Sequence, residues 1–187
     1  AAFNSLDQTA QLYDLDPAGS FVEIPFPFGS GGVTEDRYEV ILTHNRTLAR
    51  GLTLQVGAGG EYSQLAQTGP NGLVRTFWRP KGSATLAWTP AEGLDLSLKV
   101  ARVVGQLSFG DFLASVNLQA QSTNAGNNQL VPPQSWEVDL TARKNLKAGG
   151  SASVTLYARL SEDYIELIPV DGGFETRGNV DSGQLLG

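Results

Sequence analysis

His44 is the only histidine in the chain, so it is the one side chain that could complete a Ser-His-Asp catalytic arrangement. It lies near the end of a predicted strand, beside a short turn, where a substrate-facing rim is not expected. A histidine of a wall or a turn is therefore the better interpretation. A zinc site would need carboxylates in place of the missing cysteines, which is not the usual donor set. We assign no catalytic residue and do not predict an enzyme.

Two other clusters resemble ligand sites only superficially. The glycine-rich stretch 28–32 follows Pro25-Phe26-Pro27 and lacks the Lys-Ser/Thr of a phosphate loop, which predicts a flexible loop tip. Asp14 and Asp16 could offer carboxylates to calcium, but the remaining ligands of a calcium loop are missing, which predicts solvated loop acids. We assign no cofactor-binding or metal-binding residue and no cofactor, and the ligand-binding residues stay unknown.

Composition excludes several classes of protein. The net charge is −6 and no run of Lys or Arg occurs, so a nucleic-acid partner is not expected. No stretch approaches the ~18 apolar residues of a membrane-spanning helix, which argues against a helical membrane protein only. Because the chain contains no methionine, we expect that residues have been removed from its N-terminus, by a signal peptidase or by excision from a longer protein.

Alternation of apolar and polar residues dominates from about residue 34 onward, as in strands with one apolar face. The segments that show it are 34–46, 51–67, 73–89, 93–104, 134–146 and 150–168. Each reaches the ~9–11 residues of a tilted membrane strand, whereas globular strands average ~5–6. The pattern predicts an all-β fold of antiparallel, up-and-down transmembrane β-barrel strands.

The connections between these segments alternate in length. Short, turn-rich joints occupy 47–51, 89–93 and 145–150, and longer connections occupy 14–33, 68–73, 105–133 and 162–178. An outer-membrane barrel sorts its connections in this way, with periplasmic turns on one rim and extracellular loops on the other. We expect the loop from Ser108 to Gln134, which carries Phe109, Phe112, Leu113 and Val116, to fold partly over the barrel mouth and contact a ligand or partner. A disordered surface loop is the alternative.

The alternation also predicts which way the side chains of each strand point. The lipid-facing set is Leu52, Leu54, Val56, Ala84, Leu86, Leu94, Leu96, Leu98, Val138, Leu140, Val154 and Leu156. The lumen-facing set is Thr53, Gln55, Ser83, Thr85, Ser97, Lys99, Asp139, Thr141, Thr155 and Arg159. Charged residues of the polar face are expected to line a wet lumen and neutralise one another across strands, or to contact a plug domain; they are Glu39, Glu61, Lys99, Glu137, Asp139, Arg143 and Arg159. Trp88 and Trp136, at strand ends in line with the apolar face, are expected in an interfacial aromatic girdle.

Several segments resemble the barrel of TonB-dependent receptors. Residues 79–90 (RPKGSATLAWTP) resemble a recurrent hairpin whose strand ends near Trp-x-Pro, and 102–107 (RVVGQL) with 109–112 (FGDF) resemble the strand and loop start that follow it. Residues 125–136 (AGNNQLVPPQSW) resemble the most specific segment, Gly-Asn-x-x-Leu-x-Pro-x-x-Ser, and Gly178-Asn179 resembles the opening of a later strand. Together they span roughly residues 78–180.

The resemblance implies an outer-membrane receptor that takes up a large nutrient such as a metal chelate or an oligosaccharide. It further implies a plug domain, TonB and outer-membrane lipid as partners, and a barrel of about 22 strands. We expect residues 1–187 to form a single barrel segment of seven or eight strands. The alternative is an independent small outer-membrane barrel that acts as a structural, adhesion or anchoring subunit, and a third possibility is a soluble β-sandwich.

Overall fold

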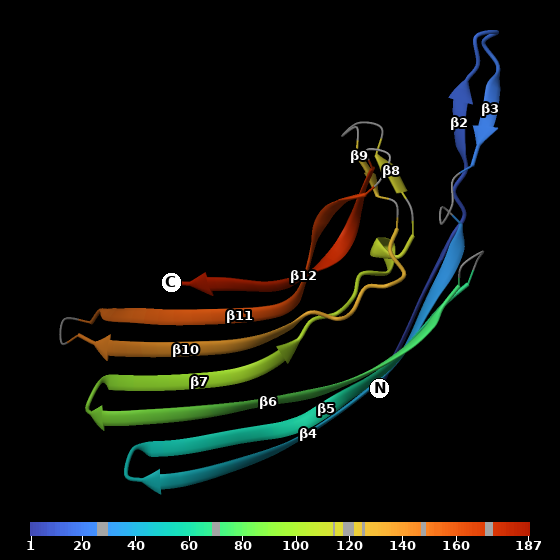
Figure 1. Cartoon of the computed structure of the whole chain (residues 1–187). Helices are drawn as coiled ribbons and strands as arrows, with labels where there is room; N and C mark the ends of the chain where they lie inside the picture. The colour runs from blue at the N-terminus through green and yellow to red at the C-terminus, as the bar shows by residue number, and fades with distance from the viewer. Residues whose placement is uncertain are drawn as a thin grey trace.

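The computed structural model describes residues 1–25, 30–68, 72–113, 115–117, 122–124, 126–146, 149–170 and 174–187, with the backbone alone for 115–117, 122–124 and 174. It is an all-β structure with one short 3-10 helix (Figure 1). The elements are β1 (Ala2–Gln8), β2 (Leu12–Leu15), β3 (Phe21–Ile24), β4 (Gly31–Ala49), β5 (Leu52–Gln67), β6 (Val74–Ala91), β7 (Leu94–Val104), η1 (Phe109–Asp111), β8 (Ser115–Asn117), β9 (Ser122–Asn124), β10 (Gln134–Asn145), β11 (Ser151–Val170) and β12 (Phe174–Leu186).

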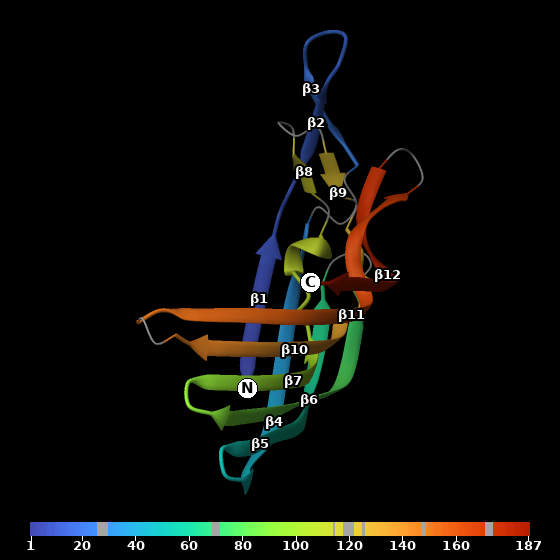
Figure 2. The same ribbon diagram turned by 90° about the vertical axis from the view of Figure 1, so that its left-hand side faces the viewer.

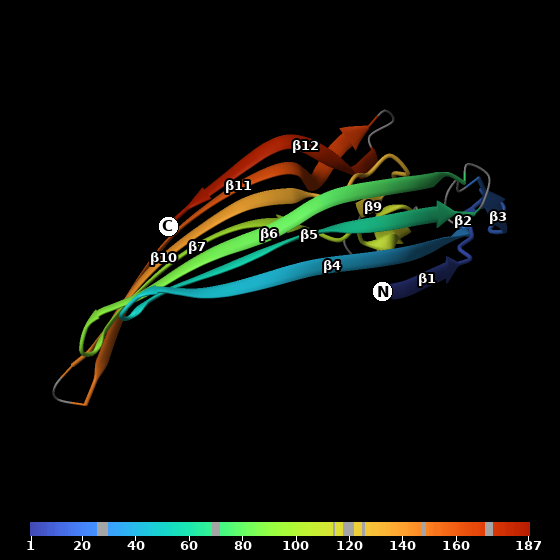
Figure 3. The same ribbon diagram turned by 90° about the horizontal axis from the view of Figure 1, so that it is seen from below.

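Ten of these strands form one sheet in the order β1-β4-β5-β6-β7-β10-β11-β12-β9-β8, and β2 pairs with β3 in a separate hairpin. Neighbours in the sheet are antiparallel except β12 and β9, which meet in parallel at Glu175 and Asn124. The sheet is open, so the described residues form a curved section of wall and not a closed barrel (Figure 3). No described helix is long and apolar enough to cross a membrane.

All six strands predicted from alternation are present, with bounds within about three residues of the expected ones, as β4, β5, β6, β7, β10 and β11. The prediction of a long connection over 162–178 is wrong. There β11 continues to Val170 and pairs with β12 from Phe174 onward. The expected connection 14–33 also contains β3 and the start of β4.

The short turns all lie at one end of the sheet, as the sequence predicts (Figure 1). Gly51 and Gly93 close two of them with φ of 71° and 69°, a left-handed conformation that side-chain-bearing residues rarely adopt. The carbonyl of each glycine accepts a hydrogen bond from the next strand, Gly51 from Thr89 at 2.8 Å and Gly93 from Asn145 at 2.7 Å. Each tight turn is thereby tied to the neighbouring hairpin.

The long connections gather at the opposite end, where β2, β3, β8 and β9 lie (Figure 1). Figure 2 shows η1 between the arm of the sheet formed by β1 and β4 and the arm formed by β11 and β12. The expected loop tip at 28–32 is only partly described, since residues 26–29 lie outside the described ranges. Gly31 and Gly32 begin β4, and the Gly32 N–H donates to Thr68 Oγ1 at 2.8 Å, so these two glycines belong to a strand.

Candidate functional site at the loop end of the sheet

Cross-strand pairing separates the predicted apolar and polar sets onto opposite faces. Leu54, Leu86, Leu98, Leu140 and Leu156 are successive partners across β5, β6, β7, β10 and β11. The neighbouring polar row runs through Thr85, Lys99, Asp139 and Tyr157 in the same way. Directly paired residues project to the same side of a sheet, so the predicted partition of side chains between two faces is confirmed.

The apolar face makes no core of its own. Val154 and Leu156 are more than half exposed, and none of the predicted lipid-facing residues belongs to the buried cluster. A soluble sandwich would pack those leucines and valines on one another, so that alternative is wrong.

Ion pairs cross the strands of the polar face in its middle and toward its loop end. Lys81 Nζ lies 2.8 Å from Glu39 Oε2 and 3.2 Å from Glu61 Oε2, which joins β4, β5 and β6. Arg159 Nη2 lies 2.7 Å from Asp139 Oδ1, and its Nε lies 3.4 Å from Glu137 Oε2. The expected neutralisation across strands is confirmed for these carboxylates and for Arg159. Lys99 and Arg143 form no ion pair with a described residue.

The loop between β7 and β10 packs against this polar face and covers its loop end. Phe112 and Leu130 are 1% and 0% exposed, and they cluster with Val33, Leu65 and Phe77 of the sheet. Phe109, also expected in the loop, packs partly buried against the cluster, and Leu113 lies within it. The side chain of Val116 lies outside the described part of the chain. The described residues of the loop thus fold back onto the polar face, as expected, whereas its place over a barrel mouth and its contact with a ligand or partner stay predictions.

Hydrogen bonds fasten the same loop to β11 and β12. Asn179 accepts a hydrogen bond from the Val131 N–H at 2.9 Å and donates to the carbonyls of Val131 and Asp163 at 2.9 Å and 2.7 Å. Asn127 Nδ2 donates to the Arg177 carbonyl at 2.8 Å. Each of the two Gly-Asn pairs that carry the family resemblance therefore contributes an asparagine to this attachment of the loop.

Gly178, beside Asn179, lies against the Ile168 side chain, which would have to move to admit a larger residue. The Ile168 side chain occupies the position that a Cβ at residue 178 would take. Asp163, the acceptor of the third Asn179 bond, has a φ of 55°, the one positive value among the described non-glycine residues. Aspartate tolerates this conformation better than most residues, and the bond from Asn179 stabilises it.

Two further polar contacts lie between the loop and the strands. Arg75 of β6 donates through Nη1 to the Leu130 carbonyl at 2.7 Å. Asp111 Oδ1 of η1 lies 3.8 Å from Arg177 Nε. Burial raises the pKa of the Asp111 carboxyl above its ordinary value, and the Arg177 guanidinium opposes this shift only in part.

Donors without a partner and, apart from them, a hollow also lie toward the loop end of the sheet. Arg37 Nη1 and Arg79 Nε are buried without a hydrogen-bond partner, and both side chains project from the polar face. Arg75 and Arg79 stand over the Phe77 ring with guanidinium carbons 5.1 Å and 5.5 Å from its centroid. A hollow of about 600 Å³ opens between β1 and the loop, lined among others by Asn4, Leu6, Glu35, Leu107 and Phe109. Sequence analysis identified none of these arginines, because each looks like any other charge of an alternating strand.

The residues considered in the sequence as catalytic or metal-binding candidates lie away from the loop between β7 and β10. His44 pairs with Val56 on the apolar face of β4, near the short turns. Asp16 accepts hydrogen bonds from the N–H groups of Ala18 and Ser20 through Oδ1, at 2.9 Å and 2.8 Å, which shapes the turn between β2 and β3. Among the described residues no group of three or more His, Cys, Asp or Glu could hold a metal ion.

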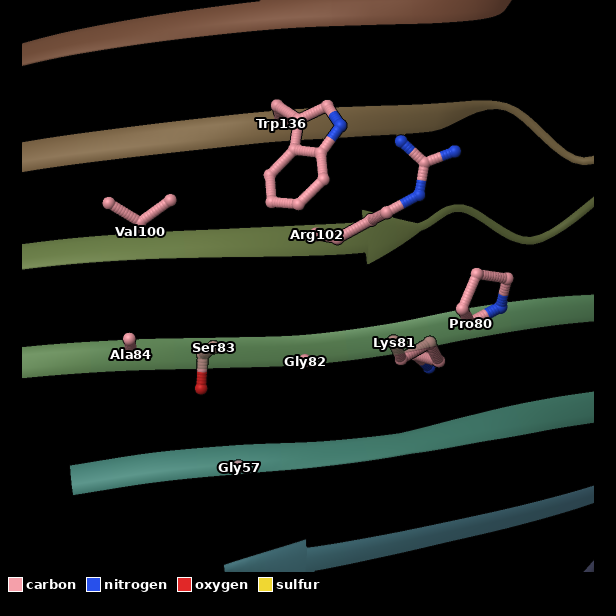
Figure 4. A pocket seen from close by; sticks show the side chains of 9 residues that line it. All are labelled: Gly57, Pro80, Lys81, Gly82, Ser83, Ala84, Val100, Arg102 and Trp136. Carbon is pink, nitrogen blue, oxygen red and sulfur yellow. The ribbon is translucent and has the colours of Figure 1, made fainter.

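Trp88 and Trp136 both lie on the apolar face and are roughly half exposed. Trp88 stands near the short turns, and Trp136 stands near the loop end of β10. Beside Trp136 the face is hollowed over Gly82 and Ala84, with Arg102 and Pro80 at the rim (Figure 4). Their positions agree with the predicted girdle, and the girdle itself stays a prediction.

Comparison with known proteins agrees with this architecture. No curated protein matches the chain. A family model described as "TonB dependent receptor-like, beta-barrel" matches residues 2–186. The family is one of outer-membrane receptors and transporters; its members lie in membrane lipid and work with TonB and a plug domain. The single-layered antiparallel sheet, its apolar outer face and the match over nearly the whole length lead to one conclusion: the chain belongs to the TonB-dependent receptor β-barrel family and forms part of the wall of an outer-membrane receptor.

Proposed function

We propose that residues 1–187 form one section of the wall of a barrel of about 22 strands, and that the receptor takes up a large nutrient such as a metal chelate or an oligosaccharide. The observation that carries the proposal is the loop 105–133, whose described apolar residues pack on the polar face at the loop end of the sheet. A loop in this place lies across the entry route, so it can contact an arriving ligand. Loops on rigid scaffolds commonly carry binding residues.

The chemistry under the loop supports recognition of oxygen-rich ligands. Arg37 and Arg79 each hold a buried N–H without a partner, and such donors are costly unless a ligand, water or protein acceptor satisfies them. Guanidinium groups bind carboxylate, phosphate and hydroxyl oxygens. Both metal chelates and oligosaccharides present such oxygens.

Uptake by intact cells tests the proposal. Cells with and without the gene are supplied with labelled iron chelates and with labelled oligosaccharides, and deletion is expected to abolish uptake of one class. Complementation with Arg37→Gln or Arg79→Gln is expected to weaken uptake at low ligand concentration roughly tenfold, about the value of one hydrogen bond to a charged group. Arg143→Gln, on the same face near the short turns, is the matched control and should leave uptake unchanged.

Unchanged uptake of every ligand after deletion would contradict a role in transport. It would favour the structural or anchoring role instead. Equal losses in Arg79→Gln and Arg143→Gln would mean that the arginines under the loop have no special part in binding.

A further inference from the structure

On β5 and β6 the side chains of the apolar face become smaller toward the loop end. Its middle row is leucine on five successive strands, the row formed by Leu54, Leu86, Leu98, Leu140 and Leu156. The next row toward the loops contains Val56, Ala84, Val100, Val138 and Ala158. The row beyond it contains Ala58, Gly82, Arg102, Trp136 and Leu160. Small residues on β5 and β6 thus lie beside larger ones on β7 and β10, which leaves a depression in the apolar face.

This depression is a groove of about 530 Å³ on the side of the sheet that meets lipid in an outer-membrane barrel. Gly82 and Ala84 form its floor, Val100 and Trp136 form one wall, and Pro80 stands at its loop end (Figure 4). The Trp78 ring covers Gly60 just above it, because a Cβ at Gly60 would lie 2.9 Å from that ring. The walls are predominantly apolar.

Arg102 puts a positive charge at the rim of this groove. A charge on the lipid-facing side of a barrel is costly unless it is neutralised or reaches the interface. Its Nη2 lies 2.7 Å from Gln134 Oε1 and 3.3 Å from Glu162 Oε2, and its guanidinium carbon lies 5.4 Å from the centroid of the Trp136 ring. These contacts hold the guanidinium in place beside the aromatic wall.

The guanidinium retains unused binding capacity. It carries five N–H donors, and the bonds to Gln134 and Glu162 both use Nη2. Among the described residues no hydrogen-bond partner is present for Nε or Nη1, and the Arg102 side chain is 19% exposed. The Glu162 side chain is 58% exposed, and an ion pair with so exposed a partner is weak. An anionic oxygen arriving from the membrane surface can therefore bind Arg102 without displacing Gln134.

We propose that this groove is a binding site for one anionic membrane lipid of the leaflet next to the loops. One acyl chain lies over Gly82 and Ala84 against Trp136, and the anionic headgroup accepts hydrogen bonds from Arg102. The arrangement couples an apolar slot to a charged rim, which is the chemistry of a membrane lipid with an acyl chain and an anionic headgroup. This site is on the outside of the wall and is independent of the nutrient proposed above.

Native mass spectrometry of the intact receptor tests the site. The receptor is released from nanodiscs of phosphatidylcholine alone or of phosphatidylcholine with phosphatidylglycerol, and the retained lipids are counted. We expect one strongly retained lipid, with phosphatidylglycerol favoured by roughly tenfold or more, as for one charge-assisted contact. Arg102→Gln should abolish that preference, and Ala84→Leu should fill the groove and remove the retained lipid.

Matched variants control for general effects on the barrel. Ala142→Leu adds the same bulk on the apolar face of β10 away from the groove, and Lys99→Gln removes a charge from the opposite face of β7. Both should retain lipid as the unaltered receptor does. If Ala84→Leu fails to fold, as judged by heat-modifiable electrophoretic mobility, Ala58→Leu fills the same depression from β5.

Three results would overturn the proposal. The first is no retained lipid, and the second is a headgroup preference that survives Arg102→Gln. The third is a receptor dimer that Ala84→Leu dissociates, which would assign the groove to a second copy of the protein. The lipid site lies outside the wall, so none of these results bears on the measurement of nutrient uptake. The lipid site can therefore be disproved while the proposed function stands.

Discussion

Asn179 is the residue whose loss should affect the loop most, because one side chain bonds to both β11 and the loop. Its three hydrogen bonds satisfy the N–H and C=O of Val131 and the carbonyl of Asp163. Asn179→Ala is expected to lower the free energy for releasing the loop by about 1–3 kcal/mol, the usual cost of leaving such groups unsatisfied. Hydrogen exchange of the amides of residues 126–134 should accelerate accordingly.

Asn45→Ala is the control for this variant, since Asn45 lies exposed on β4 near the short turns. It should leave exchange in the loop unchanged. Equal exchange in Asn179→Ala and the unaltered receptor would show that the apolar cluster alone holds the loop.

Asp111 should make the attachment of the loop depend on pH. Burial raises the pKa of its carboxyl, so the attached loop favours the protonated form relative to the released loop. The stabilisation from this group is fully present below the ordinary aspartate pKa and is lost as the pH rises through the raised value. Asp111→Asn is therefore expected to strengthen attachment at neutral pH and to remove this pH dependence, measured as amide exchange corrected for intrinsic rates. A loop that loosens at neutral pH in Asp111→Asn would show that the Arg177 ion pair outweighs burial.

At the scale of elements, β7 offers a sharp test of which face meets lipid. Leu98 and Ser97 are neighbours on this strand that project to opposite faces, toward Leu140 and Thr141 of β10 respectively. Leu98→Lys is expected to destabilise the folded barrel in liposomes by about 2–4 kcal/mol, because a lysine near the bilayer midplane is desolvated. Ser97→Lys places the same charge in the wet lumen and should change stability little. Urea titration of refolding measures both, and the opposite ranking would reverse the assignment of the faces.

At the scale of the whole molecule, the two ends of the sheet should lie on opposite sides of the outer membrane. The chain contains no cysteine, so single cysteines can be introduced without background. Ser20→Cys, at the turn of the hairpin of β2 and β3, should react with a membrane-impermeant maleimide in intact cells. Glu92→Cys, in the short turn between β6 and β7, should react only after the outer membrane is opened. Labelling of Glu92→Cys in intact cells would invert the orientation.

Sequence by itself determined the strands that cross the membrane and the direction of their side chains. Alternation is a local property with period two, so β4 to β7, β10 and β11 could be located from residues such as Leu94 to Val100. The short turns were equally readable, because glycines at 51 and 93 permit a conformation that other residues resist. The strand β12 was missed, since the predicted connection 162–178 runs across its start at Phe174 and residues 174–186 show no sustained alternation.

Only the tertiary structure decided how the loop and the charges meet. Phe112 and Leu130 are far apart in a segment without periodicity, and they come together because the polar face offers Val33, Leu65 and Phe77 as a surface to pack on. The alternation of side chains along β7 places Arg102 on the apolar face. Its contacts with Gln134 and Glu162, however, follow from the register of three strands. Such contacts join residues up to 60 positions apart. Local sequence encodes the face on which a side chain lies, whereas pairing between distant segments decides what it touches.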